Sequence, residues 1–161
     1  MADYWLSLED RLRILNDYKR IAMVGLSANQ YRPSHFAAIY MQAQGYTIYP
    51  VNPQNAGQKI LGRTVYASIT EIPDPVEIVD IFRKPEDVPP IVDEAIAIGA
   101  KVIWMQLGVI HHEAAEKARQ AGLEVVMDRC VKIEHGRFFG GLGTVGINSR
   151  VLSSRLRETK Y

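Results

Sequence analysis

The hydrophobic residues of this chain fall into short unbroken runs that alternate with longer amphipathic segments. The unbroken runs are typical of strands buried on both faces of a parallel sheet, and they cover residues 21–24, 46–51, 77–82, 101–107 and 123–127. The longer segments combine helical spacing with glycines that favour a helix C-terminus, and they predict helices over residues 7–18, 33–44, 89–98 and 112–121. The pattern is weaker over residues 54–76, where it predicts a short strand at 65–66 and one helical turn at 69–72.

Strands that alternate with helices predict right-handed βαβ units. We therefore expect an α/β fold: a doubly wound, mostly parallel sheet with helices on both faces, which is a Rossmann-like arrangement. In such a sheet the ligand crevice lies beyond the carboxyl ends of the strands. The segments that follow the strands are residues 25–34, 52–54, 82–85, 106–108 and 128–130.

Composition narrows the class of protein. The 161 residues are typical of one domain, and 19 Lys and Arg against 18 Asp and Glu leave no basic excess for general nucleic-acid or membrane binding. One cysteine excludes an intramolecular disulfide framework. The sequence has no run of about 18 apolar residues, so no membrane span is predicted. The first residues do not resemble a signal peptide. We expect a cytoplasmic protein that binds neither nucleic acid nor a membrane.

The chain divides into two parts. Residues 1–135 hold all the predicted strands, preceded by the amphipathic helix 7–18, and we expect them to form the ligand-binding domain. Residues 136–161 form a glycine-rich and then basic extension. Its apolar residues need cover, and we favour a homodimer interface over packing within one chain.

The loop after the first strand has the composition of an anion site. Gly25 lets the backbone leave the strand sharply, Ser27 and Asn29 offer short polar groups, and Arg32 stands just before the next helix. Free amides and the positive end of a helix attract anions. A plain strand-to-helix turn remains an equal alternative from this loop alone.

Two common nucleotide motifs are missing. The three glycine positions of G-x-G-x-x-G hold Gly25, Ser27 and Gln30, and residues 51–53 contain no carboxylate for a ribose diol. The chain has no G-x-x-x-x-G-K-[ST] run for a P-loop. NAD and ATP are therefore both disfavoured.

Seven short motifs in this order resemble the small stand-alone CoA-binding protein family. They are VG-x-S at 24–27, RPS at 32–34, PVNP at 50–53, VDIFR at 79–83, AIGAK at 97–101, WMQLG at 104–108 and VMDRC at 126–130. The fold of that family is similar to the CoA-binding domain at the start of the succinyl-CoA synthetase alpha subunit. The resemblance covers about residues 10–133 and implies coenzyme A as the ligand.

The resemblance also implies where each part of CoA binds. The first loop would hold the pyrophosphate with Gly25, Ser27, Ala28, Asn29 and Gln30, close to Arg32, Pro33 and Ser34. The segment after the second strand would approach the ribose 3′-phosphate with Asn52 and Pro53. The segment after the middle strand would flank the adenine with Phe82, Arg83 and Lys84. The next turn would line the pantetheine path with Gln106, Leu107 and Gly108.

One position departs from the synthetase-like pattern. There the Asn-Pro pair is followed by a lysine that meets the 3′-phosphate, whereas this chain has Gln54. A phosphate accepts a cation from any direction, so Lys59, Arg83 or Lys84 could take that role.

The chain contains no evident catalytic constellation and no predicted metal site. Cys130 is the one candidate nucleophile, either as a buried inert thiol or as a thiol that forms a mixed disulfide with CoA. His111 and His112 are adjacent, a spacing that does not suit one shared metal. His35 lies in the first turn of the helix after the phosphate loop, where packing is favoured over ligand contact.

The sequence thus predicts a nucleotide-binding module that holds CoA or an acyl-CoA without turning it over. Two alternatives remain open. One is an enzyme that acts on a CoA thioester with Cys130 as its nucleophile. The other is an NAD-type nucleotide-sensing module, against which the missing carboxylate after Val51 argues.

Overall fold

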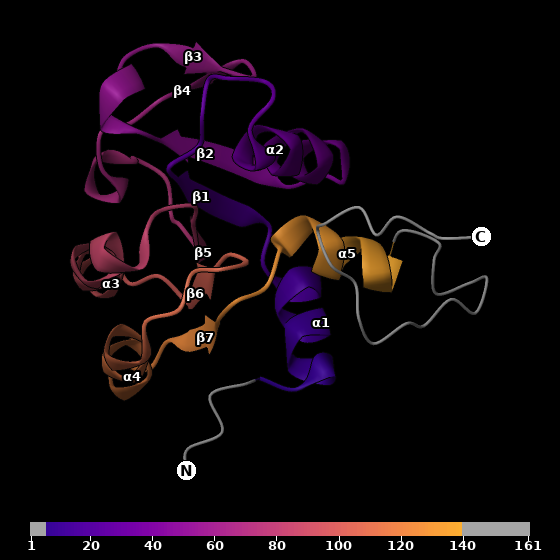
Figure 1. Ribbon diagram of the computed structural model, residues 1–161, viewed down its shortest axis with the longest axis vertical. Helices are drawn as coiled ribbons and strands as arrows, with labels where there is room; N and C mark the ends of the chain where they lie inside the picture. Colours follow the sequence, from indigo (N-terminus) through magenta and orange to yellow (C-terminus); the bar gives the residue numbers. More distant parts are fainter. Residues whose placement is uncertain (1–5, 140–161) are drawn as a thin grey trace.

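Five parallel strands form one sheet in the order β2-β1-β5-β6-β7 in the computed structural model, which describes residues 6–139 (Figure 1). The strands are β1 (Arg20–Val24), β2 (Thr47–Val51), β5 (Ile78–Ile81), β6 (Val102–Met105) and β7 (Glu124–Val126). Every neighbouring pair runs parallel. The five predicted strands are therefore present, and each lies inside its predicted range except for the first residue of β1.

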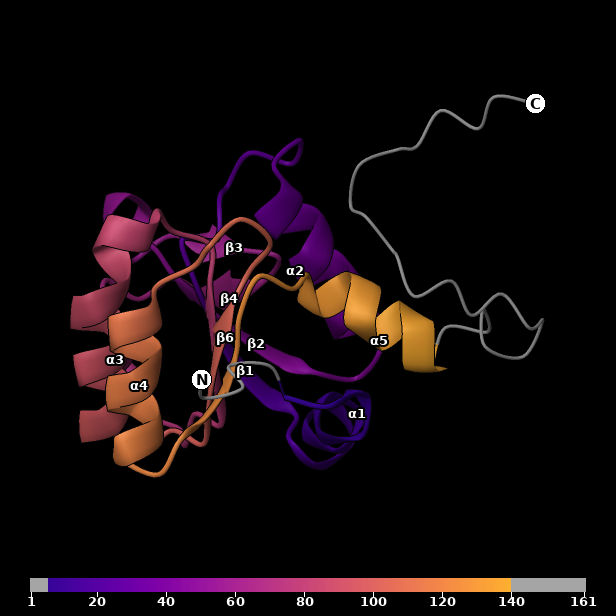
Figure 2. The same cartoon turned by 60° about the horizontal axis from the view of Figure 1, so that its bottom comes forward.

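Helices cover both faces of this sheet. They are α1 (Leu8–Asp17), α2 (Pro33–Ala43), α3 (Val88–Ala97), α4 (His112–Gln120) and α5 (Val131–Phe139). Figure 2 shows α3 and α4 on one side of the sheet and α1, α2 and α5 on the other. The predicted doubly wound, Rossmann-like α/β fold is confirmed.

The region of weak pattern folds into short elements at the β2 edge. A two-stranded hairpin, β3 (Lys59–Ile60) with β4 (Arg63–Thr64), precedes the 3-10 turn η2 (Ile69–Glu71). The predicted helical turn corresponds to η2. The short strand expected at 65–66 is reduced to one parallel bridge between Val51 and Tyr66. Two further 3-10 turns, η1 (Pro53–Asn55) and η3 (Pro85–Asp87), follow β2 and β5.

Helix α5 was not predicted from the sequence. It begins directly after Cys130 and runs past residue 135, the expected end of the domain. The buried Arg11 Nε–Glu134 Oε2 pair, at 2.9 Å, ties it to α1. The division of the chain at 135/136 stays a prediction, because residues 140–161, which hold most of the expected extension, lie outside the described residues.

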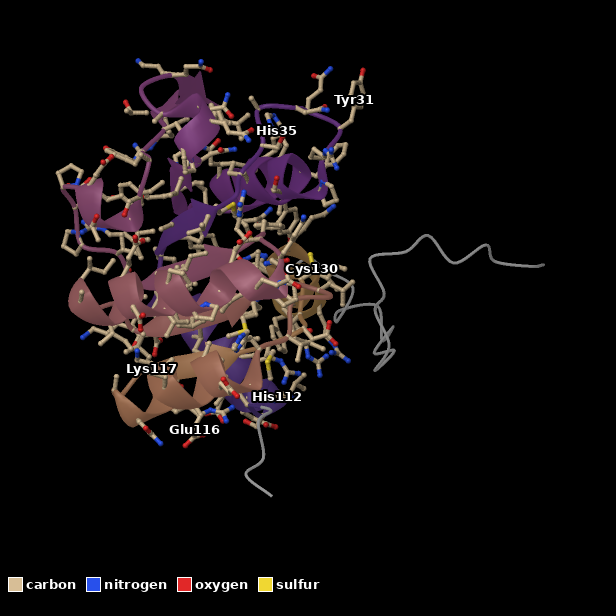
Figure 3. The ribbon with its side chains drawn as sticks, turned by 60° about the vertical axis from the view of Figure 1, so that its left-hand side comes forward. Tyr31, His35, His112, Glu116, Lys117 and Cys130 are labelled. Atoms are coloured by element: carbon tan, nitrogen blue, oxygen red, sulfur yellow. The ribbon has the colours of Figure 1, made fainter. Side chains whose placement is uncertain are left out.

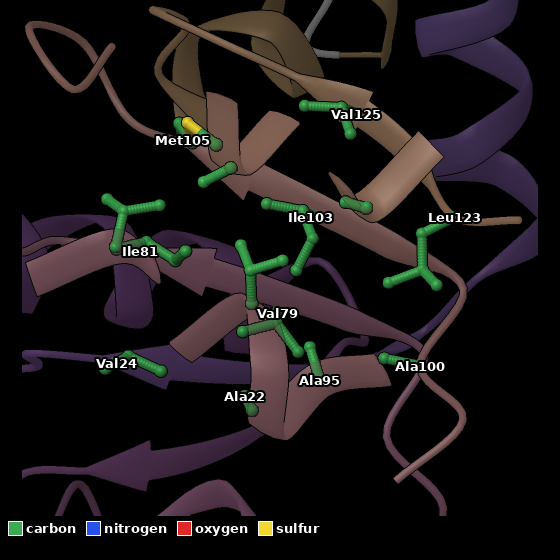
Figure 4. Packing of buried hydrophobic residues seen from close by; sticks show 14 of the residues in the cluster. Ala22, Val24, Val79, Ile81, Ala95, Ala100, Ile103, Met105, Leu123 and Val125 are labelled. Carbon is green, nitrogen blue, oxygen red and sulfur yellow. The ribbon is translucent and has the colours of Figure 1, made fainter. Parts of the chain in front are cut away.

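Alternate residues of each strand enter two separate cores, as the two-residue period of a strand requires. Ala22 and Val79, among others, pack under α3 and α4 (Figure 4). Ile21 and Ile78 face the other way, toward α1, α2 and α5, where Trp104 is the largest buried side chain. Asp80, two residues after Ile78, therefore belongs to this second face although it is fully buried.

Candidate functional site

The order of the strands puts a crevice between β1 and β5. Chain connections leave these neighbours in opposite directions, to β2 on one side and to β6 on the other. Open α/β sheets bind ligands at such a switch point, beyond the carboxyl ends of the strands. Gly25 follows β1 here and Phe82 follows β5, and the Phe82 amide donates to the Val24 carbonyl at 2.8 Å.

Gly25 occupies a position that no other residue fits. Its φ of +87° lies in the left-handed region, and its amide donates to the Val51 carbonyl at 2.8 Å. A Cβ there would overlap the carbonyl oxygen of Phe82 and lie 2.9 Å from Cδ of Arg83. The backbone can therefore turn between β2 and β5 only because the side chain is absent.

A cavity of about 510 Å³ opens beside this turn, and we call it the carboxyl-end pocket. Ten of the residues nominated from the sequence line it: Gly25, Ser27, Arg32, Pro33, Ser34, Asn52, Phe82, Gln106, Leu107 and the candidate nucleophile Cys130. One other residue, Val109, completes the lining within residues 6–139. Val109 was missed because an isolated valine in a loop carries no sequence signal for a ligand.

The loop between β1 and α2 is held in shape by hydrogen bonds among its own polar groups. The Ser27 amide donates to Ser34 Oγ at 3.1 Å, and the Asn29 amide donates to Ser27 Oγ at 3.1 Å. His35 Nδ1 donates to the Ser27 carbonyl at 2.9 Å, so His35 is buried and braces the loop. Asn52 Nδ2 donates to the Leu26 carbonyl at 3.2 Å and ties the end of β2 to the same loop.

The N-terminus of α2 lies at this pocket, and its first residues, Pro33 and Ser34, line the cavity. Within residues 6–139 no side chain caps the helix, and Pro33 occupies its first turn. Arg32, the residue at the cap position, is exposed and lines the pocket. The positive end of a helix beside an arginine is suited to a phosphate group.

A second, smaller cavity of about 260 Å³ lies on the other side of Gly25, which lines both cavities. Pro53 and Arg83 are found here, in the side groove between the ends of β1 and β2 and helix α3. Three carboxylates also line the side groove, from Glu86, Asp87 and Glu94. Arg83 Nη2 pairs with Asp87 Oδ2 at 3.1 Å, so part of its charge is already neutralised.

Gln106, which lines the carboxyl-end pocket, is hydrogen-bonded to the buried carboxyl group of Asp80. Gln106 Nε2 donates to Asp80 Oδ1 at 2.6 Å, while Asp80 Oδ2 has no hydrogen-bond partner among the described residues. Burial raises the pKa of Asp80 to about 8, against the lowering effect of the Gln106 hydrogen bond. The group is therefore largely protonated at neutral pH.

Comparison with known proteins identifies the family. The pattern that defines the CoA binding domain matches residues 19–136. The chain belongs to the CoA-binding domain family. This confirms the resemblance read from the seven motifs.

Two curated proteins are similar to this CoA-binding domain. The uncharacterised protein YneT of Bacillus subtilis is 40% identical over 122 residues, which are 76% of this chain and 89% of YneT. The alpha subunit of an ADP-forming acetate–CoA ligase of Pyrococcus furiosus is 30% identical over 129 residues. That match covers 71% of this chain but 28% of the subunit.

Solved structures have the same fold. A hypothetical protein of Pyrococcus horikoshii superposes with a TM-score of 0.82 at 41% identity, over 87% of this chain and 97% of its own. A Thermus thermophilus protein superposes with a TM-score of 0.79 at 36% identity, over 83% of this chain and all of its own.

The remaining nominated residues are not among the residues that line the two cavities in the described part of the chain. Ala28, Asn29 and Gln30 are exposed at the outer turn of the loop, and Lys84 is exposed after β5. The Gly108 amide donates to Asp128 Oδ1 at 2.7 Å, which fixes the turn after β6. Their contact with a ligand stays a prediction.

The histidine pair is separate from this site. His111 Nδ1 accepts from the Ala114 amide at 3.1 Å and caps α4. Figure 3 shows His112 on α4 with Glu116 and Lys117, apart from Cys130. In residues 6–139, no three His, Cys, Asp or Glu side chains come together as metal ligands. In the same stretch no helix has the length and hydropathy needed to cross a membrane.

Proposed function

We propose that this CoA-binding domain binds CoA or an acyl-CoA reversibly in the carboxyl-end pocket and does not turn it over. The observation that carries the proposal is the meeting of ten motif residues in one cavity at the β1–β5 switch point, in a chain of this family. The segments concerned are far apart in the sequence, and the sheet alone brings them together.

The pyrophosphate occupies the N-terminus of α2 in this proposal. A phosphate there faces the helix dipole and the exposed guanidinium of Arg32, which can donate two parallel hydrogen bonds. The loop is already braced by Ser34 and His35, so little ordering is needed when the ligand enters.

The two ends of CoA extend in opposite directions from Gly25. The adenosine end enters the side groove beside Pro53 and Arg83, and the pantetheine end passes Gln106, Leu107 and Val109. The carboxylates of the side groove repel a phosphate, and Gln54 supplies no cation. The ribose 3′-phosphate therefore contributes little to affinity.

The composition of the pocket wall favours holding over hydrolysis. No histidine lines the pocket in the described part of the chain. His35 uses Nδ1 to hold the Ser27 carbonyl, and His135 bonds to Tyr40 Oη at 2.9 Å. A thioester hydrolase with Cys130 as nucleophile would need a base at the thiol; hydrolysis of acetyl-CoA that Cys130→Ala abolishes would establish that alternative instead.

Location and assembly follow from the sequence only. We expect the protein in the cytoplasm and expect it to form a homodimer. Analytical ultracentrifugation of the full chain tests the second expectation, and a single monomeric species at micromolar concentration contradicts it.

Isothermal titration of the ligand-free protein with CoA, dephospho-CoA and NAD tests the proposed function. We expect CoA and dephospho-CoA to bind with affinities within about threefold, since the lost phosphate contact amounts to less than ~1 kcal/mol. NAD should give no measurable heat. Absence of binding by CoA, or tighter binding by NAD, would overturn the proposal.

A further inference from the structure

Asp80 is an acid surrounded by apolar residues of the neighbouring strands. It lies on β5, the central strand of the sheet, and its register partners are Met23 on β1 and Trp104 on β6. All three residues are fully buried. Burying a polar group costs free energy that an apolar residue would not cost. Packing alone therefore does not account for an acid at this position.

Gln106 connects this acid to the carboxyl-end pocket. Its Nε2 donates to Asp80 Oδ1 at 2.6 Å. Gln106 directly follows β6, is only 4% exposed, and lines the cavity together with Leu107 and Cys130. The hydrogen bond therefore joins the interior of the sheet to the part of the wall that the proposed function assigns to pantetheine.

The side-chain amide of Gln106 is only half used. Nε2 is bonded to Asp80, whereas Oε1 has no hydrogen-bond partner among residues 6–139. In the same residues, Asp80 Oδ2 is the one enclosed side-chain nitrogen or oxygen without a partner. Gln106 Oε1 is therefore not enclosed, and the cavity that Gln106 lines is where it is open. A nearly buried side chain thus presents an unused acceptor to the pocket.

The pair is suited to an uncharged ligand group. Burial raises the pKa of Asp80 to about 8, so at neutral pH the pair is mostly uncharged and needs no counter-ion. Among the described residues that line the cavity, Arg32 alone carries a full charge. Arg32 stands at the N-terminus of α2, where we place the pyrophosphate. The wall at Gln106 is thus the neutral part of the pocket.

We propose that Gln106 Oε1 accepts a hydrogen bond from an amide N–H of the pantetheine arm, and that Asp80 positions Gln106 for this contact without touching the ligand. The inference rests on the CoA binding proposed above and adds the group by which the arm is recognised. Pantetheine is uncharged and contains two amides. An amide N–H and a glutamine carbonyl form the same kind of hydrogen bond as two backbone groups.

The contact distinguishes CoA from shorter nucleotides. ADP carries the adenosine and the pyrophosphate of CoA but no pantetheine arm, so it cannot reach the acceptor on Gln106. Removing that acceptor should therefore weaken CoA binding and leave ADP binding unchanged. A change that merely distorted the pocket would weaken both.

Titration calorimetry of the full-length protein with CoA, and with ADP at millimolar concentration, tests the role of Gln106. Gln106→Leu removes the acceptor and keeps a side chain of similar size. We expect about a tenfold loss of CoA affinity and an ADP affinity within twofold of the wild type. Gln44→Leu, at the exposed C-terminal end of α2, is the matched control and should change neither affinity.

A double-mutant cycle tests the role of Asp80. Asp80→Leu removes the partner of Gln106 and should lower CoA affinity at least threefold, again without an effect on ADP. The double variant Asp80→Leu/Gln106→Leu should bind CoA no more weakly than Gln106→Leu alone, because Asp80 acts only through Gln106. Replacing both partners by apolar groups leaves no buried polar atom unpaired, so the double variant should fold even where the single Asp80 variant does not. Denaturant unfolding checks each protein.

Each contrary result has a distinct meaning. A CoA affinity of Gln106→Leu within twofold of the wild type would overturn the inference. Equal losses of CoA and ADP affinity would show a general disturbance of the pocket and overturn it too. Additive losses in the double variant would overturn the positioning role of Asp80. In all three cases the wild type still binds CoA and the proposed function stands, whereas a wild type that does not bind CoA would overturn both.

Discussion

One face of the sheet packs only apolar side chains against α3 and α4, whereas the opposite face carries all the buried polar groups of residues 6–139. The buried Arg, Ser, His, Asp, Gln and Glu side chains belong to Arg11, Ser34, His35, Asp80, Gln106, Glu134 and His135. Six of them lie on α1, α2 or α5 or on the strand face beneath these helices, and Gln106 directly follows β6. Burying polar groups costs stability unless they are paired. We call the face under α3 and α4 the scaffold face, and the face under α1, α2 and α5 the polar face.

The polar face is itself divided. Between α1 and α5 the Arg11–Glu134 pair satisfies its charges internally, and its role is to fasten α5. Near the carboxyl ends of the strands, Asp80 leaves one oxygen without a partner and Gln106 opens onto the pocket. The unsatisfied group lies beside the part of the face where we propose that CoA binds.

Of the changes considered, Gly25→Ala should have the largest effect on stability and on CoA binding. The new Cβ meets the Phe82 carbonyl and the left-handed backbone penalises any side chain, so we expect a loss of about 3 kcal/mol in stability and no detectable CoA binding. Gly45→Ala is the matched control, because Gly45 has a φ of +90° but no atom within 4 Å of the added Cβ. It should cost about 1 kcal/mol and leave CoA affinity unchanged. Denaturant unfolding and calorimetry measure both, and equal effects of the two changes would refute the steric role of Gly25.

Asp80→Asn should alter the pH dependence of stability. The pKa of Asp80 is raised from 3.8 to about 8 in the folded protein, so between these values the native state binds more protons than the unfolded state. Stability then falls as pH rises through this window. From about pH 5 to pH 8 we expect the wild type to lose on the order of 4 kcal/mol relative to Asp80→Asn, because each pH unit in this window costs about 1.4 kcal/mol. Parallel stability curves for the two proteins would show that Asp80 is not buried as a neutral acid.

Arg32→Ala should weaken CoA binding about tenfold, which is ~1.4 kcal/mol, and leave stability nearly unchanged because Arg32 is exposed. Arg20→Ala is the control, since Arg20 is exposed at the amino end of β1, away from the pocket. Titration calorimetry compares the two. A similar loss in both variants would indicate a general charge effect rather than a phosphate contact.

Ile103→Val tests the scaffold face, where a change should lower stability without changing CoA affinity. Ile103 is fully buried under α3 and α4, and removal of one methyl group costs about 1 kcal/mol. CoA affinity should stay within twofold of the wild type, as measured on the folded protein. A large loss of affinity would mean that the two faces are coupled.

Much of the fold was predictable because its signals are local. Runs such as residues 21–24 mark buried strands, and a serine with an aspartate three residues later marks the start of α1, where Ser7 Oγ accepts from the Asp10 amide at 3.0 Å. The loop from Gly25 to Ser34 was nominated for the same reason. A glycine directly after a strand and a proline before a helix are read from the sequence without tertiary information.

What the sequence did not reveal depends on contacts between distant residues. Helix α5 has a glycine at Gly136 and no clear apolar period, and it is fixed by the pair between Arg11 and Glu134, 123 residues apart. The β3–β4 hairpin turns at Leu61, whose φ of 51° is unusual for a leucine. The hydrogen bond between Asp80 and Gln106 joins β5 to the residue that follows β6. Neither motif alone predicts a buried neutral acid beneath the pocket.

A crystal structure of the protein with CoA would show directly whether CoA binds in the carboxyl-end pocket. We predict the pyrophosphate at the N-terminus of α2 within hydrogen-bonding distance of the Gly25–Ser34 loop, and the CoA sulfur beside Cys130. CoA bound on the face covered by α3 and α4, or in the carboxyl-end pocket with its sulfur directed away from Cys130, would contradict the account.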